Sequence, residues 1–385
     1  MAKTTSRDVK NIFLQKGKLD ITFLSLVLIL LTFGLIMLFS ASYASALEYE
    51  NDSYEFIKSQ SMFAGIGVIG MLIVSKINYK FWRIVSLPLF VATSFLLFLL
   101  LVMKPAFENT DVKRWFAIGS FSFQPSEIAK FALVIFLATI IASNQKKMNS
   151  WRFVPWLFAF VGGTSLLIVL EPHLSAAILV GAIGVVMIFV GGLNRWVAIA
   201  GVVFVVVCVV FVVVTQSTGF ISYGADRIAN WKDPWKDATD GGFQTVQSLM
   251  AIGSGGILGR GLGQSRQKYL WVPEPQNDFI FSIICEELGL IGAIAIIVLF
   301  ALLVWRGFKI AMSSPDKYGS LLSIGLTFQV GLQATLNFWV VTNTIPNTGI
   351  SLPFFSYGGT ALMILLVEMG VVLSVSRASN IEKIN

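Results

Sequence analysis

The chain has 385 residues, of which 56% are hydrophobic and 13% are charged, and its mean hydropathy is +0.78. Soluble domains carry roughly 25% charged residues, so this composition excludes a soluble fold and indicates an integral membrane protein. The net charge of +7 does not indicate nucleic-acid binding, because the cations lie in short runs between apolar segments.

About ten apolar segments approach the roughly 20 residues needed to cross a bilayer. They are 21–46, 57–77, 83–103, 126–143, 152–171, 174–193, 196–215, 279–305, 318–341 and 355–376. The sequence therefore predicts an all-α polytopic membrane protein. We expect a cytoplasmic tail over 1–18, a ten-helix membrane domain over 19–377, and a short cytoplasmic tail over 378–385.

The positions of lysine and arginine predict the orientation, because short cytoplasmic loops are enriched in these residues. Alternate connections carry the cations, which are Lys76, Lys80, Arg83, Lys146, Lys147, Arg152, Arg195, Arg306, Lys309 and Lys317. The first connection on the other side is acidic instead. This alternation predicts cytoplasmic termini and a large extracellular loop, 216–278, between the seventh and eighth helices.

Charged and aromatic residues flank the start of the fourth segment. Arg114 and Trp115 precede it, Ser126 is a candidate N-cap, and Glu127 and Lys130 lie three residues apart on one helix face. A charge at the membrane boundary is costly unless it is paired or hydrated. Glu127 and Lys130 therefore form either an internal ion pair that fixes helix packing or, as we favour, the charged wall of an outward-facing cavity.

The large loop contains two further candidate regions. Residues 226–240 alternate aromatic and charged side chains, which favours a segment lying at the membrane surface over one that contacts substrate directly. Residues 253–268 combine many glycines with Arg260, Arg266 and Lys268. This second region is either a flexible connector or a binding site for phosphate oxygens.

Three acidic residues mark the start of the eighth segment. Asp278 stands at its entrance and is either an N-cap or a functional carboxylate. Glu286 and Glu287 lie at least ~12 Å deeper by helical rise, and we interpret them as structural.

The backbone over 343–360 is interrupted by prolines and glycines at membrane depth, so it must be covered by protein or line a water-filled cavity. Ser356 and Tyr357 offer hydroxyl groups to such a cavity. His173, the only histidine, is expected to be a hairpin residue, because no motif for a serine nucleophile accompanies it.

These segments in this order resemble the SEDS family (shape, elongation, division and sporulation), which includes FtsW, RodA and SpoVE. The resemblance extends over nearly the whole chain and is carried by 123–130, 259–268, 273–281, 286–289 and 352–359. It is closer to the division and sporulation branch, because of Ser122–Glu127 and Gln264–Tyr269.

The resemblance implies a peptidoglycan glycosyltransferase that polymerises lipid II, with inversion, outside the bacterial cytoplasmic membrane. It also implies a class B penicillin-binding protein and other divisome-type proteins as partners, and no nucleic acid. Asp278 matches the essential aspartate of the family, and Trp115, Glu127 and Lys130 match its conserved positions. His173 departs from the family pattern, which usually has aspartate there.

As a mechanism, we expect Asp278 to act as the base that activates a sugar hydroxyl. The leaving diphosphate needs positive charge, for which Lys130, Arg260, Arg266 and Lys268 are candidates. Glu127 would orient Lys130 or share a metal ion with Asp278. We therefore expect either a divalent cation, Mg²⁺ or Mn²⁺, or no cofactor.

Two other classes remain open at this stage. A lipid II flippase suits the many helices and the interrupted backbone, and a scaffold for the penicillin-binding protein suits either activity. Most candidate polar groups lie on the predicted outer face, which favours chemistry there over a path through the membrane.

Overall fold

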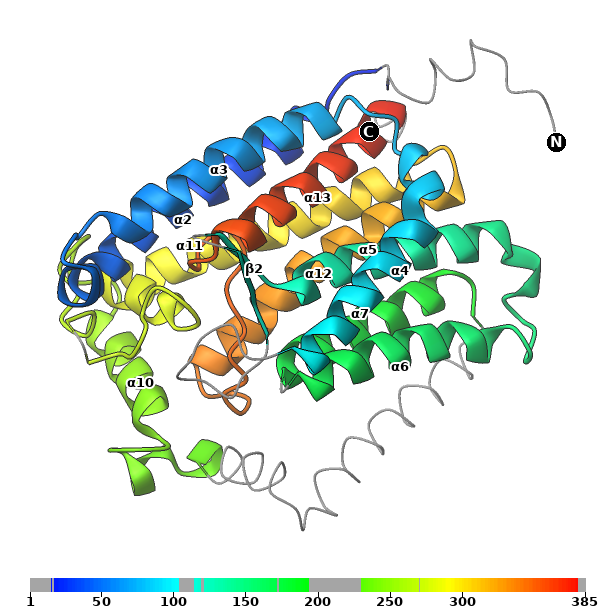
Figure 1. The fold of residues 1–385 in the computed structure, drawn as a ribbon. Helices are drawn as coiled ribbons and strands as arrows, with labels where there is room; N and C mark the ends of the chain where they lie inside the picture. The colour runs from blue at the N-terminus through cyan, green and yellow to red at the C-terminus, as the bar shows by residue number, and fades with distance from the viewer. Residues whose placement is uncertain are drawn as a thin grey trace.

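The computed structural model describes residues 15, 17–103, 114–118, 121–171, 173–193, 230–269 and 271–379 (Figure 1). In this part of the chain, seven helices are long and apolar enough to cross a membrane. They are α2 (Ile21–Glu50), α3 (Glu55–Val74), α4 (Phe81–Val102), α5 (Pro125–Ser143), α11 (Ile280–Met312), α12 (Lys317–Val341) and α13 (Gly359–Ala378). Two shorter apolar helices, α6 (Val154–Leu170) and α7 (Leu174–Val190), bring the bundle to nine in the described part. The predicted segment 196–215 lies outside the described residues.

The remaining elements are short. An antiparallel hairpin of β1 (Phe116–Ile118) and β2 (Phe121–Phe123) precedes α5, with Phe116 opposite Phe123. The 3-10 turns η1 (Gln145–Lys147) and η2 (Pro234–Asp237) and the helix α10 (Phe243–Gly255) complete the described elements. Neither the hairpin nor α10 is predicted by the sequence patterns described above.

The bundle has two chemically different ends. At the first, the loop end, α2, α4, α6 and α12 finish and α5, α7, α11 and α13 begin, and the long connections gather there (Figure 1). At the second, the basic end, α2 begins and α13 finishes side by side, because Arg377 Nη1 donates to the carbonyl oxygen of Gly17 at 3.0 Å. The predicted cationic connections α3–α4, α5–α6 and α11–α12 lie at this basic end, and Arg195 lies outside the described residues.

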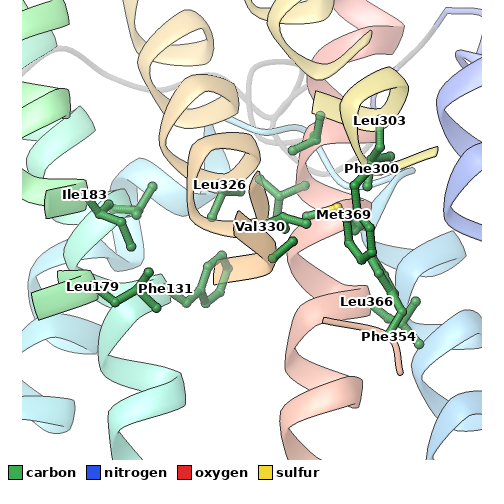
Figure 2. Packing of buried hydrophobic residues seen from close by; sticks show 14 of the residues in the cluster. Phe131, Leu179, Ile183, Phe300, Leu303, Leu326, Val330, Phe354, Leu366 and Met369 are labelled. Atoms are coloured by element: carbon green, nitrogen blue, oxygen red, sulfur yellow. The ribbon is translucent and has the colours of Figure 1, made fainter. Parts of the chain in front are cut away.

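The helix α12 lies in the middle of the bundle and contacts α5, α7, α11 and α13. Figure 2 shows its Leu326 and Val330 between Phe131 of α5 on one side and Met369 of α13 on the other. These side chains are at most 5% exposed. Lipid cannot drive helices together as water does, so this dense packing holds the bundle.

Glycines let α3 and α13 approach closely. A Cβ atom on Gly370 would lie 2.6 Å from the carbonyl oxygen of Met71, and one on Gly67 would lie 2.6 Å from the Leu366 side chain. Small residues at such contacts are typical of membrane helix pairs, because they bring the backbones into van der Waals contact. The prediction of an all-α polytopic membrane protein is therefore confirmed.

Candidate active site at the loop end of the bundle

The first turn of α5 brings a buried ion pair to the loop end. Pro125 starts the helix after the N-cap residue Gln124, and Glu127 lies in the first turn. Ser126 is therefore not the N-cap, and its buried hydroxyl has no hydrogen-bond partner. Lys130 Nζ lies 2.9 Å from Glu127 Oε1, with side-chain exposures of 2% and 18%. The predicted i, i+3 pairing is present.

Three amide side chains on α12, which we call the amide row (Gln329, Gln333 and Asn337), organise the polar groups around this pair. They are spaced four residues apart and therefore share one helix face. Lys130 Nζ donates to Gln333 Oε1 at 3.2 Å, and Gln333 Nε2 donates to the carbonyl oxygen of Ser351 at 3.1 Å. One turn away, Gln329 Nε2 donates to the buried carboxylate of Glu368 at 3.0 Å.

The third member of the amide row holds the entrance of α11. Asn337 Nδ2 donates to the carbonyl oxygen of Asp278 at 2.8 Å and to that of Ile350 at 2.6 Å. The amide row therefore connects the segment carrying Lys130, the segment carrying Asp278 and the loop 342–358. Sequence reasoning missed it, although amides at i, i+4 and i+8 in an apolar segment were a usable signal.

A cavity opens beside this network. Its polar lining consists of Glu127, Gln329, Gln333, Ser351, Ser356, Tyr357 and Glu368, and its volume is about 40 Å³. Glu368 lies nine residues into α13, so the polar lining reaches about 13 Å from the start of that helix. Glu127 is thus both a member of an ion pair and part of a cavity wall, which unites the two alternatives of the sequence analysis.

Asp278 lies on the rim of the same region. Ser356 Oγ donates to the carbonyl oxygen of Asn277 at 2.7 Å, and the Tyr357 N–H donates to that of Gln276 at 2.8 Å. The loop 342–358 is therefore bonded to the residues just before Asp278. Asp278 itself is half-buried and is not among the residues lining the cavity. It is not the N-cap of α11, which is Phe279 without a side-chain cap.

Close approach of the backbone makes room for this aspartate. A Cβ atom on Gly349, where φ is +66°, would lie 3.1 Å from Asp278 Oδ2. A side chain there would press on the carboxylate and would also strain the backbone. The interrupted backbone predicted over 343–360 therefore lies against Asp278 at Gly349.

The turn between α6 and α7 closes another side of the region. Gln124 Nε2 lies 3.0 Å from His173 Nδ1, and an amide nitrogen only donates, so Nδ1 accepts. Burial, together with the cations of Arg114 and Lys130, lowers the pKa of His173 to about 3, so the imidazole is neutral at pH 7. His173 is a hairpin residue as predicted, and it also contacts the start of α5.

The same turn holds a buried acid that sequence reasoning missed. Arg114 Nε donates to the carbonyl oxygen of Glu171 at 3.4 Å, but both carboxyl oxygens of Glu171 are buried without a hydrogen-bond partner. Burial raises the pKa of Glu171 to about 8, against the opposing charge of Arg114. The Glu171 side chain is therefore mostly protonated at pH 7.

The glycine-rich loop, residues 253–268, supports the helix α11 where that helix is interrupted. The helix α11 is broken at Gly289, where φ is +66°. The N–H groups of Arg260 and Gly261 donate to the carbonyl oxygens of Glu286 and Glu287, at 2.9 and 3.0 Å. The loop thus supplies hydrogen-bond partners that the broken helix has lost.

The loop also surrounds both deep glutamates. Glu287 accepts from Ser40 Oγ at 2.7 Å, Gly263 N at 2.9 Å and Lys268 Nζ at 3.0 Å. Glu286 accepts from the N–H of Arg266 at 3.0 Å, and Arg260 Nε lies 3.6 Å away from it. These contacts agree with the structural interpretation of both glutamates.

The predicted cationic pocket is therefore not a single cluster. Lys268 is 3% exposed and its ammonium group is held by Glu287, Ser40 and Gly263, and Arg260 is directed toward Glu286. The Arg266 side chain is exposed. The roles of these three cations as diphosphate ligands stay predictions, which the contacts of Lys268 do not support.

The remaining candidates lie around the same end. Trp115 is half-buried next to β1. Ser356 and Tyr357 line the cavity as expected, although the Ser356 hydroxyl is already bonded to Asn277. In the segment 230–240, Trp231 Nε1 donates to the carbonyl oxygen of Asn343 at 3.0 Å, which fastens this segment to the end of α12.

In the described part of the chain, no group of three or more His, Cys, Asp or Glu side chains is placed to hold a metal ion. The divalent cation expected at Asp278 stays a prediction, and no step below is derived from a metal.

A membrane-spanning bundle with a polar cavity, a buried lysine and an aspartate at one end defines a polytopic membrane protein with a candidate site at that end. The family model of the cell cycle proteins FtsW, RodA and SpoVE matches residues 21–381. The chain belongs to this family and is a multi-pass protein of the cytoplasmic membrane.

Individual relatives agree with this assignment. The chain is 42% identical to stage V sporulation protein E of Bacillus subtilis, over 95% of this chain and 99% of that protein. It is 37% identical to the probable peptidoglycan glycosyltransferase FtsW of Geobacter sp. strain M18, over 93% and 96%.

Two solved structures share the fold. A chain of a peptidoglycan synthase complex that coordinates polymerization and crosslinking is 26% identical with a TM-score of 0.76, over 93% of this chain and 98% of that chain. The rod shape determining protein RodA of Thermus thermophilus is 25% identical with a TM-score of 0.68, over 94% and 98%.

Proposed function

We propose that this chain is a peptidoglycan glycosyltransferase that polymerises lipid II on the outer face of the cytoplasmic membrane, in division or sporulation. The loop end faces outward and the basic end faces the cytoplasm, because the cationic connections gather at the basic end. The segment 196–215 is the proposed remaining span, which would bring the total to ten. The support for it is that α7 finishes at the basic end, whereas Trp231 is bonded to Asn343 at the loop end.

The amide row carries this proposal. Through Gln333 and Asn337, one face of α12 ties the buried Lys130 and the backbone of Asp278 to adjacent residues, Ser351 and Ile350. A base and a cation for the leaving group must both be held in a fixed geometry, because catalysis depends on positioning. A rigid spanning helix that fixes both segments meets that requirement.

In the proposed reaction, the oxygen of the acceptor hydroxyl forms a bond to the anomeric carbon of the donor sugar. The carboxylate of Asp278 takes the proton of that hydroxyl in the same step. The bond from that carbon to the diphosphate breaks, and the leaving group carries the electron pair. The ammonium group of Lys130 stabilises this developing charge, and Glu127 keeps Lys130 in place through their 2.9 Å contact.

The membrane setting fits a lipid-linked substrate. The polyprenyl chain stays in the bilayer while the sugars and diphosphate reach the polar cavity, whose lining includes Tyr357 near its start and Glu368 at depth. A divalent cation bound jointly by Asp278 and substrate phosphates is a separate proposal, since Mg²⁺ often takes only one or two protein carboxylates.

A class B penicillin-binding protein is the proposed partner, together with other divisome-type proteins. The support is the fold shared with a chain of a complex that coordinates polymerization and crosslinking. The alternatives are a lipid II flippase and a scaffold, and neither requires a base at Asp278.

The test is polymerisation of fluorescent lipid II by the purified chain with its partner, read as glycan strands on a gel. Asp278→Asn should abolish polymerisation, whereas Asp240→Asn, an exposed acid of the same end, should not change it. Wild-type activity in Asp278→Asn would remove the base from the mechanism. Absence of polymerisation by the wild-type complex, with flipping in liposomes, would favour the flippase.

A further inference from the structure

A second cavity lies at the basic end, away from the candidate active site. Its volume is about 310 Å³, and it opens where the α3–α4 connection, the end of α5 and the start of α12 meet. Its lining residues are Lys80, Arg83, Ala142, Gln145, Asp316, Lys317 and Tyr318. Three cations thus share the cavity with one acid.

The one acid in the lining is already engaged by the protein. Asp316 Oδ1 accepts from the Gly319 N–H at 2.8 Å as the N-cap of α12. Its Oδ2 accepts from the Tyr79 hydroxyl at 2.8 Å and lies 3.5 Å from Lys80 Nζ. The charge of Asp316 is therefore shared with Lys80 and does not compensate the other two cations.

Arg83 and Lys317 are held in place by neutral partners. Arg83 Nη2 donates to Ser143 Oγ at 2.8 Å, and Lys317 Nζ donates to the carbonyl oxygen of Val190 at 2.9 Å. In the described part of the chain, neither cation lies within 4.0 Å of a carboxylate. A guanidinium group has five N–H donors and an ammonium group has three, so both keep donors for an anion.

The position of the cavity identifies the source of the anion. It lies where α3, α5 and α11 finish and α4 and α12 begin, and three of these helices, α4, α5 and α12, border it directly. The ends of membrane-spanning helices lie at the headgroup layer, where basic pockets between helices bind anionic headgroups.

The surface of α4 continues from the cavity toward the membrane interior. Leu87 follows Arg83 by one turn on the same helix face, is 58% exposed, and begins an exposed apolar row with Val91 and Phe95. An acyl chain can lie along this row while its phosphate occupies the cavity. A free phosphate ion would gain nothing from these side chains.

We propose that the cavity lined by Arg83 and Lys317 is a binding site for the phosphate headgroup of an anionic phospholipid. The phosphate oxygens accept hydrogen bonds from both cations, and the acyl chain lies against α4. This site is separate from the lipid II reaction and does not depend on it.

Native mass spectrometry of the purified full-length chain tests the proposal, with phosphatidylglycerol, phosphatidylcholine and inorganic phosphate as probes. We expect phosphatidylglycerol to bind more tightly than phosphatidylcholine, and millimolar inorganic phosphate not to displace it. The double variant Arg83→Gln/Lys317→Gln should weaken phosphatidylglycerol binding by about thirtyfold, since each cation near an anionic headgroup contributes about fivefold.

Matched variants separate a specific site from general charge. Lys18→Gln/Arg152→Gln removes the same charge from exposed positions of the basic end, outside the cavity, and should bind like wild type. Arg83→Lys/Lys317→Arg keeps the charge and should keep the lipid preference. If the first double variant does not fold, each single Gln variant should show the fivefold loss.

Three results would overturn the proposal. Equal binding of the two lipids would remove the headgroup preference, and equal loss in the cavity and control variants would remove the site. Displacement by inorganic phosphate would show that the cavity takes a free anion and not a lipid.

Discussion

Two buried lysine–glutamate pairs at the loop end are almost identical in geometry and differ in what surrounds them. Lys130 lies 2.9 Å from Glu127, and Lys268 lies 3.0 Å from Glu287. In the second pair the side chains are at most 4% exposed, and Ser40, Gly263 and Ser265 supply further hydrogen bonds to the carboxylate. In the first pair Glu127 is 18% exposed and lines a cavity.

The difference shows how one kind of charge pair serves two purposes. A buried carboxylate whose lone pairs are all taken by the protein is fixed and stabilises one backbone arrangement, here the broken α11. A carboxylate that keeps an open side beside a cavity can respond to a ligand or to water.

Removal of Lys268, the cation of the more deeply buried pair, should have the largest effect on stability. Lys268→Met leaves Glu287 buried without its counter-charge, which typically costs about 3–5 kcal/mol. We expect a large fall in the thermal unfolding midpoint in nanodiscs, and partial recovery in Lys268→Met/Glu287→Gln. A wild-type midpoint in the single variant would show that Glu287 does not depend on Lys268.

Removal of the carboxylate of Glu127, which lines the cavity, should affect activity more than stability. Glu127→Gln keeps the shape of the side chain but loses the charge that positions Lys130, and a misplaced catalytic group costs about 10²-fold in rate. Lipid II polymerisation per folded molecule measures this effect. Glu48→Gln, an exposed acid at the end of α2, is the matched control and should polymerise normally.

A substitution that changes no charge should also weaken the Lys268–Glu287 pair, because it disturbs the backbone that supports the pair. Gly289 has φ of +66°, and an added Cβ would lie 2.5 Å from the carbonyl oxygen of Ile257. Gly289→Ala should therefore destabilise the protein by about 1–3 kcal/mol. Gly65→Ala, where the space is open, is the control for chemical unfolding. Equal stability of the two variants would contradict the proposed support of α11 by the glycine-rich loop.

Glu171 is a third buried glutamate, one whose carboxyl oxygens have no hydrogen-bond partner, and it should make the stability depend on pH. Its pKa is raised to about 8 by burial, above the ordinary value of 4.5, so its stabilisation is present at low pH and is lost as the pH rises toward and through 8. Glu171→Gln should match wild type at pH 5 and exceed it by roughly 1 kcal/mol or more at pH 8.5. Parallel pH profiles of the two unfolding midpoints would show that Glu171 is already ionised.

The sequence predicted the membrane helices well, because lipid imposes a length and composition that each segment shows by itself. It also identified the i, i+3 spacing of Glu127 and Lys130. It did not predict the ion pair of Lys268 with Glu287. The two residues lie 19 positions apart, and the pair depends on the break of α11 at Gly289.

The amide row was missed for a related reason. Gln329, Gln333 and Asn337 mark a polar face of α12, but their partners come from α5, α11, α13 and the loop 342–358. Such partners depend on how helices pack and not on local spacing. Glu171 likewise looks like an ordinary helix-end acid until the surrounding helices bury it.

The most direct test of the account is the lipid II polymerisation rate of Lys130→Met, normalised to folded protein and set beside its unfolding midpoint. We expect a fall in rate of at least about 10²-fold, with a smaller loss of stability than in Lys268→Met. Polymerisation by Lys130→Met at the wild-type rate would contradict the role of Lys130 at the leaving diphosphate.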